Sequence, residues 1–206
     1  MDLNETAQES AFRSEARTWL EANVPTSALP SFDTAEGFAL HREWEQKLYD
    51  GGWSAVSWPV EYGGRDADYI MWLIFEEEYY RVGGPQRVTQ NGIFLLAPTI
   101  FEFGTDEQKA RFLPRMAAAD DLWCQGWSEP DAGSDLASLR CRAVRDGDEF
   151  VIDGQKVWSS YASDANFGML LARTDPDALK PQMGITMFIL PIHASGVTVR
   201  PLVDIA

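Results

Sequence analysis

Apolar residues recur at helical spacing through the first 120 residues, and this pattern predicts a bundle of amphipathic helices. In the first segment Phe12, Ala16 and Leu20 lie about one helical turn apart, with charged residues between them. Pro and Gly residues stand near the ends of the segments, where they terminate helices. The predicted helices span about residues 5–22, 34–50, 68–82, 89–103 and 105–116.

Capping residues, prolines and glycines predict where several helices begin and end. Asp68 is a plausible N-cap for the third helix, and Thr105 with Gln108 forms a capping box before the fifth. Pro98 should kink the fourth helix or mark a first turn, and the glycines at 51–52 end the second. The third helix is expected to bury Ile70, Leu73, Ile74 and Tyr80 and to expose the acidic run at residues 76–78.

From Asp121 onward the pattern changes to short alternating runs joined by turns, which is typical of a β-barrel or sandwich. Asp146 and Gly147 predict a hairpin turn. The expected fold is therefore an all-α bundle over residues 1–120, followed by an antiparallel β-barrel domain over residues 121–206. The predicted strands span residues 122–127, 137–144, 149–152, 155–160, 167–173, 185–190 and 197–200.

Composition narrows the classes of function. Lys plus Arg is 17 and Asp plus Glu is 32, which gives a net charge of −15 and argues against nucleic-acid or anionic-membrane partners. Cys124 and Cys141 form no spaced framework and suggest no metal site, and His41 is expected to serve packing or the surface. No segment reads as a signal peptide or membrane span, so a cytoplasmic location is expected.

The stretch Trp123–Asp135 lies where the pattern changes from helical to strand-like. It reads as an apolar strand followed by a turn of small polar residues. Such a turn can present hydroxyl and backbone N–H groups to a flat polar ligand, although it can also be a simple domain junction. The chain has no phosphate-binding glycine motif of the Walker or dinucleotide type, and its two histidines support no nucleophilic triad.

Four motifs, in register along nearly the whole chain, resemble the acyl-CoA dehydrogenase family. Gln125–Leu136, with the run Trp-Ser-Glu-Pro-Asp-Ala-Gly-Ser-Asp, is similar to the signature sequence of that family. Asp153–Ser160 resembles its second flavin motif. Trp58–Gly64 and Gly104–Lys109 resemble a loop and a helix start of the same family. The amino-acid sequence of residues 124–130 is most similar to that of the family branch that handles lipid, steroid or other unusual acyl-CoA substrates.

The resemblance implies a flavoprotein oxidoreductase of lipid metabolism, such as beta-oxidation, with FAD as cofactor and an acyl-CoA thioester as substrate. In that reaction a base removes the α proton while the β hydrogen leaves as hydride to flavin N5. A double bond then forms between the α and β carbons. The family further implies an electron-transfer flavoprotein as electron acceptor and a homo- or hetero-oligomer.

The same resemblance assigns candidate site residues. Ser134 matches a position that touches both the cofactor and the CoA arm, and Gln90 and Phe94 would line the acyl pocket by position. Glu129 belongs structurally to the motif's turn and is not assigned as the base. The residues that match cofactor-binding positions are Gln125, Trp127, Ser128, Ser134, Trp158 and Ser160.

No catalytic base is named, because the family supplies it from a C-terminal helical domain that is expected to be missing here, together with the last strands of the barrel. The chain alone is therefore expected to be inactive. Two alternatives remain: a non-catalytic flavin- or acyl-CoA-binding subunit of a heteromeric dehydrogenase, or a family member with oxidase or monooxygenase chemistry.

Overall fold

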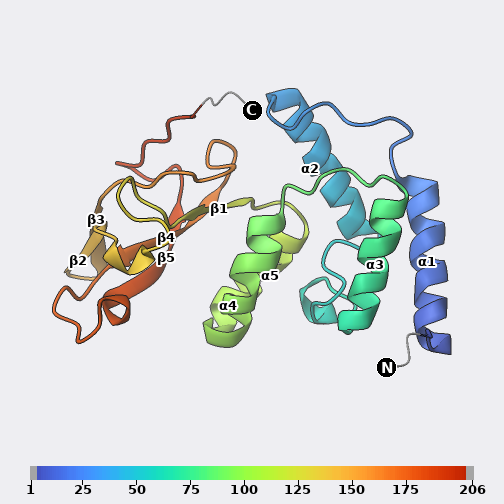
Figure 1. The fold of residues 1–206 in the computed structure, drawn as a ribbon, viewed down its shortest axis with the longest axis horizontal. Coiled ribbons are helices and arrows are strands. Elements are labelled where there is room, and N and C mark those ends of the chain that lie inside the picture. The colour runs from blue at the N-terminus through green and yellow to red at the C-terminus, as the bar shows by residue number, and fades with distance from the viewer. Residues whose placement is uncertain (1–3, 203–206) are drawn as a thin grey trace. The chain divides into compact units, whose positions relative to one another are not determined.

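The computed structural model describes residues 4–202, which fold into two compact units divided between Asp120 and Asp121 (Figure 1). The first unit is helical and the second is built on a β-sheet, so the predicted order of fold types is confirmed. The outermost parts of the predicted domains, residues 1–3 and 203–206, lie outside the described residues. No helix within residues 4–202 combines the length and apolar character needed to cross a bilayer.

Five α-helices form the first unit, close to the predicted positions (Figure 1). A π-helix, Asn91–Leu96, runs directly into the fourth of them. Pro98 lies in the first turn of that helix, at the junction with the π-helix, where it cannot donate a hydrogen bond to the preceding turn. The helices are α1 (Ala7–Asn23), α2 (Ala35–Asp50), α3 (Tyr69–Arg81), α4 (Ala97–Phe103) and α5 (Asp106–Ala117).

Side-chain caps fix the beginnings of these helices. The Asp68 carboxylate accepts the Met71 N–H at 2.9 Å, and Thr105 with Gln108 forms the complete capping box. Both predicted caps are therefore confirmed. The capped ends supply acceptors for N–H groups that have no partner inside the helix, which explains why the sequence located them well.

The core of this unit is aromatic. Trp53 stacks on Phe75 with ring centroids 5.6 Å apart, and the Trp44 indole donates to the Tyr79 hydroxyl at 2.7 Å. Trp19 packs so closely on Gly51 that a Cβ there would lie 2.3 Å from the indole ring. Only glycine permits this approach.

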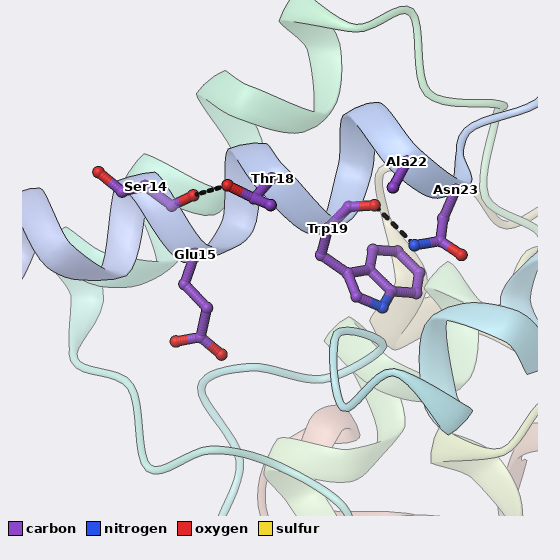
Figure 2. A pocket seen from close by; sticks show the side chains of 6 residues that line it. All are labelled: Ser14, Glu15, Thr18, Trp19, Ala22 and Asn23. Carbon is purple, nitrogen blue, oxygen red and sulfur yellow. Dashed lines mark hydrogen bonds between the residues drawn. The ribbon is translucent and has the colours of Figure 1, made fainter.

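A shallow hollow lies beside Trp19 on α1 (Figure 2). Its polar groups are already used within the helix, because Thr18 donates to the Ser14 carbonyl and Asn23 to the Trp19 carbonyl, both at 2.8 Å. The hollow therefore offers little chemistry for a ligand. Its lining residues are Ser14, Glu15, Thr18, Trp19, Ala22 and Asn23.

The prediction for the buried face of α3 was largely wrong. Ile74 is buried as expected, but Ile70, Leu73 and Tyr80 are exposed. The buried face instead consists of Ile74, Phe75, Glu78 and Tyr79. Glu78, expected in solvent with the rest of its acidic run, is 1% exposed.

Three arginines explain the burial of Glu78. Its carboxylate accepts hydrogen bonds from Arg13, Arg17 and Arg81 at 2.7–2.9 Å. Arg13 and Arg17 come from α1, so this charge cluster joins α1 to α3. Charge-assisted bonds of this kind offset the cost of removing a carboxylate from water.

The Glu78 cluster predicts a specific pH dependence of stability. Hydrogen bonds from Arg17, opposed by burial and reinforced by Arg81 and Arg13, lower the pKa of Glu78 from 4.5 to about 2. Because the folded pKa is depressed, the stabilisation is complete above about pH 4.5 and is lost as the pH falls towards about 2. Urea unfolding should show wild type more stable than Glu78→Gln at neutral pH, with the difference shrinking through this window. A difference that stays constant from neutral pH to pH 2 would contradict the assignment.

The second unit holds one five-stranded sheet in which β4 is central (Figure 1). Residues Phe167–Leu170 of β4 pair with both β1 and β5, so these two strands lie on opposite edges of β4. β1 is parallel to β4, β5 is antiparallel to it, and β2 forms a hairpin with β3. The strands are β1 (Trp123–Gly126), β2 (Arg142–Asp146), β3 (Glu149–Asp153), β4 (Phe167–Arg173) and β5 (Ile185–Pro191).

This sheet differs in detail from the predicted antiparallel barrel. Within residues 121–202 the sheet is mixed, because β1 and β2 both run parallel to β4, and it does not close into a barrel. The predicted strand at 137–144 begins only at Arg142, after a 3₁₀ turn at Leu136–Ser138, and residues 155–160 and 197–200 form no strand. The hairpin turn at Gly147 is confirmed, with φ of +62°.

Candidate functional site

The end of β1 leads directly into the turn that the sequence singled out. Gln125 lies on β1, and Trp127, Ser128 and Glu129 follow it. An isolated antiparallel β-bridge between Glu129 and Ala132 closes the turn. The Glu129 N–H donates to the Ala132 carbonyl at 2.8 Å, and the Ala132 N–H donates to the Glu129 carbonyl at 3.1 Å. Ser134 lies beyond this bridge and is exposed.

A second segment, residues 156–160, is attached to this turn. The Val157 N–H donates to the Ser128 carbonyl at 2.9 Å. The Lys156 ammonium donates to the Trp127 carbonyl at 3.0 Å and to Glu129 Oε1 at 2.8 Å. These contacts explain why the predicted strand at 155–160 does not form: its polar groups bond to the turn and not to a strand ladder.

Glu129 is buried within this arrangement and remains ionised. Its carboxylate also accepts the backbone N–H groups of Arg140 at 2.6 Å and Cys141 at 2.8 Å. Burial alone would raise the pKa of Glu129, but the Lys156 ammonium and the two N–H groups outweigh burial and lower it. The Glu129 carboxylate therefore connects the turn to Lys156 and to the residues before β2, which supports the structural role expected for it.

Trp158 has an unusual conformation for a bulky residue. Its φ is +58°, in the left-handed region, and its side chain is 73% exposed. A strained backbone that presents an indole to solvent is uncommon and is associated with functional sites. Ser160, also exposed, follows two residues later, with its N–H bonded to the Trp158 carbonyl at 3.1 Å.

The structure thus brings together most of the cofactor-binding candidates in the β unit. Trp127 and Ser128 are joined to the segment that carries Trp158 and Ser160 through Lys156 and Val157. Ser134 lies on the outer part of the same turn. Gln125 precedes the turn on β1, where it is half-buried.

The two acyl-pocket candidates belong to the helical unit and form a separate group. Gln90 is exposed just before the π-helix, and Phe94 is half-buried within it. Phe94 stacks on Trp72 at 5.7 Å, and the Arg87 guanidinium lies 5.9 Å from the Phe94 ring centre. π-helical turns often occur at functional sites, and the assignment of Gln90 and Phe94 to an acyl pocket stays a prediction.

Sequence reasoning missed two polar elements near these residues. Lys156 lies within the Asp153–Ser160 motif, but the sequence assigns it no role, because its partners Trp127 and Glu129 are 29 and 27 positions away. The buried pair of Arg87 with Glu45 was not foreseen, because the two residues are 42 positions apart and no local pattern links them.

Comparison with known protein families settles the family. A model of the acyl-CoA dehydrogenase N-terminal domain matches residues 6–120, and a model of the middle domain of the same family matches residues 124–205. This chain belongs to the acyl-CoA dehydrogenase family.

Its curated relatives include other bacterial acyl-CoA dehydrogenases. The acyl-CoA dehydrogenase IpdE1 of Mycobacterium tuberculosis is 41% identical over 200 residues, which cover 94% of this chain and 52% of the relative. Acyl-CoA dehydrogenase FadE26 of the same organism is 38% identical and covers 98% of this chain and 52% of its own length. The chain therefore spans about half the length of these relatives.

Solved structures of acyl-CoA dehydrogenases share the fold. The ChsE4–ChsE5 complex from Mycobacterium tuberculosis aligns over 100% of this chain and 52% of its own, with a TM-score of 0.81 and 37% identity. A steroid acyl-CoA dehydrogenase, Tcur3481–Tcur3483, aligns over 95% of this chain and 50% of its own, with a TM-score of 0.78 and 36% identity.

The candidate residues fit the flavin that an acyl-CoA dehydrogenase of this kind would hold. The Trp127 indole N–H is buried without a hydrogen-bond partner among the described residues. A buried donor without a partner is costly, and a ring that carries carbonyl acceptors would satisfy it. The exposed Trp158 supplies an apolar surface of the size that a flat aromatic ligand covers.

Proposed function

We propose that this chain provides the FAD-binding residues and part of the acyl pocket of an acyl-CoA dehydrogenase that carries out α,β-dehydrogenation of an acyl-CoA thioester. The observation that carries the proposal is the attachment of residues 156–160 to the turn at 127–129, which gathers Trp127, Ser128 and Trp158 in one place. Bound FAD would supply the hydride acceptor at flavin N5.

The residues of the chain would act by binding and orientation. The Trp127 indole and the Ser128 hydroxyl would donate hydrogen bonds to the polar edge of the flavin, and Trp158 would cover an apolar face. Ser160 and Gln125 would add polar contacts, and Ser134 would contact both cofactor and CoA arm. Gln90 and Phe94 would line the acyl pocket. No base is assigned among these residues.

The relatives guide the choice of substrate and partner. One structural neighbour is described as a steroid acyl-CoA dehydrogenase, so we propose a steroid-derived or similarly bulky acyl-CoA as substrate. We also propose an oligomer in a cytoplasmic setting, with an electron-transfer flavoprotein as electron acceptor.

A second candidate function is that of a flavin- or acyl-CoA-binding subunit within a heteromeric dehydrogenase. The observation that favours it is the likeness to structures that contain two different subunits, such as the ChsE4–ChsE5 complex. In this case the turn and the attached segment keep their binding role, and the partner contributes the base.

Anaerobic titration tests the proposed reaction. The FAD-loaded protein, as its gene expresses it with any co-purifying subunit, is mixed with a steroid acyl-CoA and with a straight-chain acyl-CoA. We expect the flavin absorbance to bleach, and we expect Ser128→Ala to slow the bleaching. Ser163→Ala, at an exposed position of the same unit, should leave it unchanged. Bound flavin that no acyl-CoA reduces would overturn the dehydrogenase proposal, and rapid peroxide release in air would favour an oxidase.

A further inference from the structure

We propose that Glu129 and Lys156 are positioning residues that hold Trp158 in its exposed, left-handed conformation for the cofactor. The inference rests on the proposed function, because it concerns the same flavin site. Neither residue would touch the flavin ring. Both would act through the backbone of the turn and of the attached segment.

The Glu129–Lys156 pair is nearly withdrawn from solvent. The Lys156 side chain is 10% exposed and the Glu129 side chain 7% exposed, with 2.8 Å between Nζ and Oε1. A pair this buried is held in one geometry, because moving either charge away would leave the other buried and alone. It is therefore suited to fixing the relative position of two segments.

The pair joins three parts of the β unit. Lys156 belongs to the segment that carries Trp158, and it also binds the Trp127 carbonyl at 3.0 Å. Glu129 belongs to the turn, and its carboxylate accepts the N–H groups of Arg140 and Cys141 immediately before β2. The segment is thus connected, through a single carboxylate, to the turn after β1 and to the start of β2.

The conformation of Trp158 needs such a constraint. L-residues with bulky side chains rarely adopt positive φ, and a conformation of this kind persists only where the surroundings over-determine it. The Trp158 side chain is mostly exposed, so its own packing cannot hold the backbone. The bonds of Lys156 and Val157, two and one residues before Trp158, fix the backbone that leads into this conformation.

Fluorine NMR of the full chain labelled with 5-fluorotryptophan tests this role without cofactor. Trp158→Phe assigns the Trp158 resonance. In Lys156→Met, we expect that resonance to shift and to narrow as the segment becomes mobile, while the tryptophans of the helical unit keep their shifts. Lys156→Arg keeps the charge and should restore the resonance in part. The matched control is Arg142→Met, which breaks the exposed Arg142–Asp153 pair and should leave Trp158 unchanged.

The outcomes distinguish a role of Lys156 in positioning Trp158 from a general loss of fold stability and from failure of the proposed function. Loss of all tryptophan shifts in Lys156→Met, or an unchanged Trp158 resonance, would overturn the positioning role. In a parallel FAD titration we expect Lys156→Met to bind about tenfold more weakly, equivalent to about 1.4 kcal/mol. A mobile Trp158 with wild-type FAD affinity would also overturn the inference. If Trp158 responds but wild type binds no FAD, the proposed function fails while the structural link between Lys156 and Trp158 stands.

Discussion

Glu45→Gln should lower the free energy of unfolding of the helical unit by about 3–5 kcal/mol, because it breaks a fully buried ion pair. Glu45 is 0% exposed and Arg87 5% exposed. The Glu45 carboxylate accepts two bonds from Arg87, at 3.0 and 2.9 Å, and the N–H groups of Val88 and Thr89 at 2.8 and 3.2 Å. Glutamine cannot accept all four, and it leaves the Arg87 charge buried without a counter-ion.

A matched neutralisation at the surface provides the control for this result. Asp120 pairs with Arg115 at 3.6 Å in the same unit, and both side chains are about half exposed. Asp120→Asn should change stability by no more than about 0.5 kcal/mol. Chemical unfolding followed by far-ultraviolet circular dichroism measures both variants. Equal effects of the two substitutions would show that burial does not set the energy of the Glu45–Arg87 pair.

Trp158→Gly should separate stability from cofactor binding. Glycine removes the left-handed strain of about 1–2 kcal/mol, but its extra unfolded-state entropy costs about 0.5–1 kcal/mol, so stability should rise by no more than about 1.5 kcal/mol. The affinity for FAD should nevertheless fall by about 30-fold or more, as expected when a central aromatic contact of about 2 kcal/mol is lost.

Two variants complete this test. Trp158→Phe keeps an aromatic face and should bind FAD more tightly than Trp158→Gly. Leu179→Gly removes another exposed apolar side chain of the β unit, 92% exposed, and should leave FAD binding unchanged. A large loss of thermal stability in Trp158→Gly would show instead that the indole belongs to the core.

The sequence predicted those features of the fold that depend on nearby residues. The caps at Asp68 and Thr105 and the bounds of β4 follow from local spacing, and they were confirmed. The buried face of α3 was missed because it depends on Arg13 and Arg17, which bind Glu78 from 65 and 61 positions away. Local amphipathicity cannot show that a carboxylate will meet such partners.

The same limit applies to the candidate site. Alternating residues at 155–160 resemble a strand, but Lys156 and Val157 bond to residues 127–129, 27 to 29 positions earlier. Motif resemblance named Ser128 and Trp158 without showing how they come together. The backbone strain at Trp158 and the buried Glu129–Lys156 pair emerge only from the three-dimensional arrangement.

Equilibrium binding of FAD to the purified protein tests the central claim, that residues 125–134 and 156–160 form a flavin site. We predict one FAD per chain, with a shifted and structured flavin absorption band. Ser128→Ala and Trp158→Gly should weaken binding, and Leu179→Gly should not. Absence of FAD binding, or binding that neither Ser128→Ala nor Trp158→Gly alters, would contradict the account.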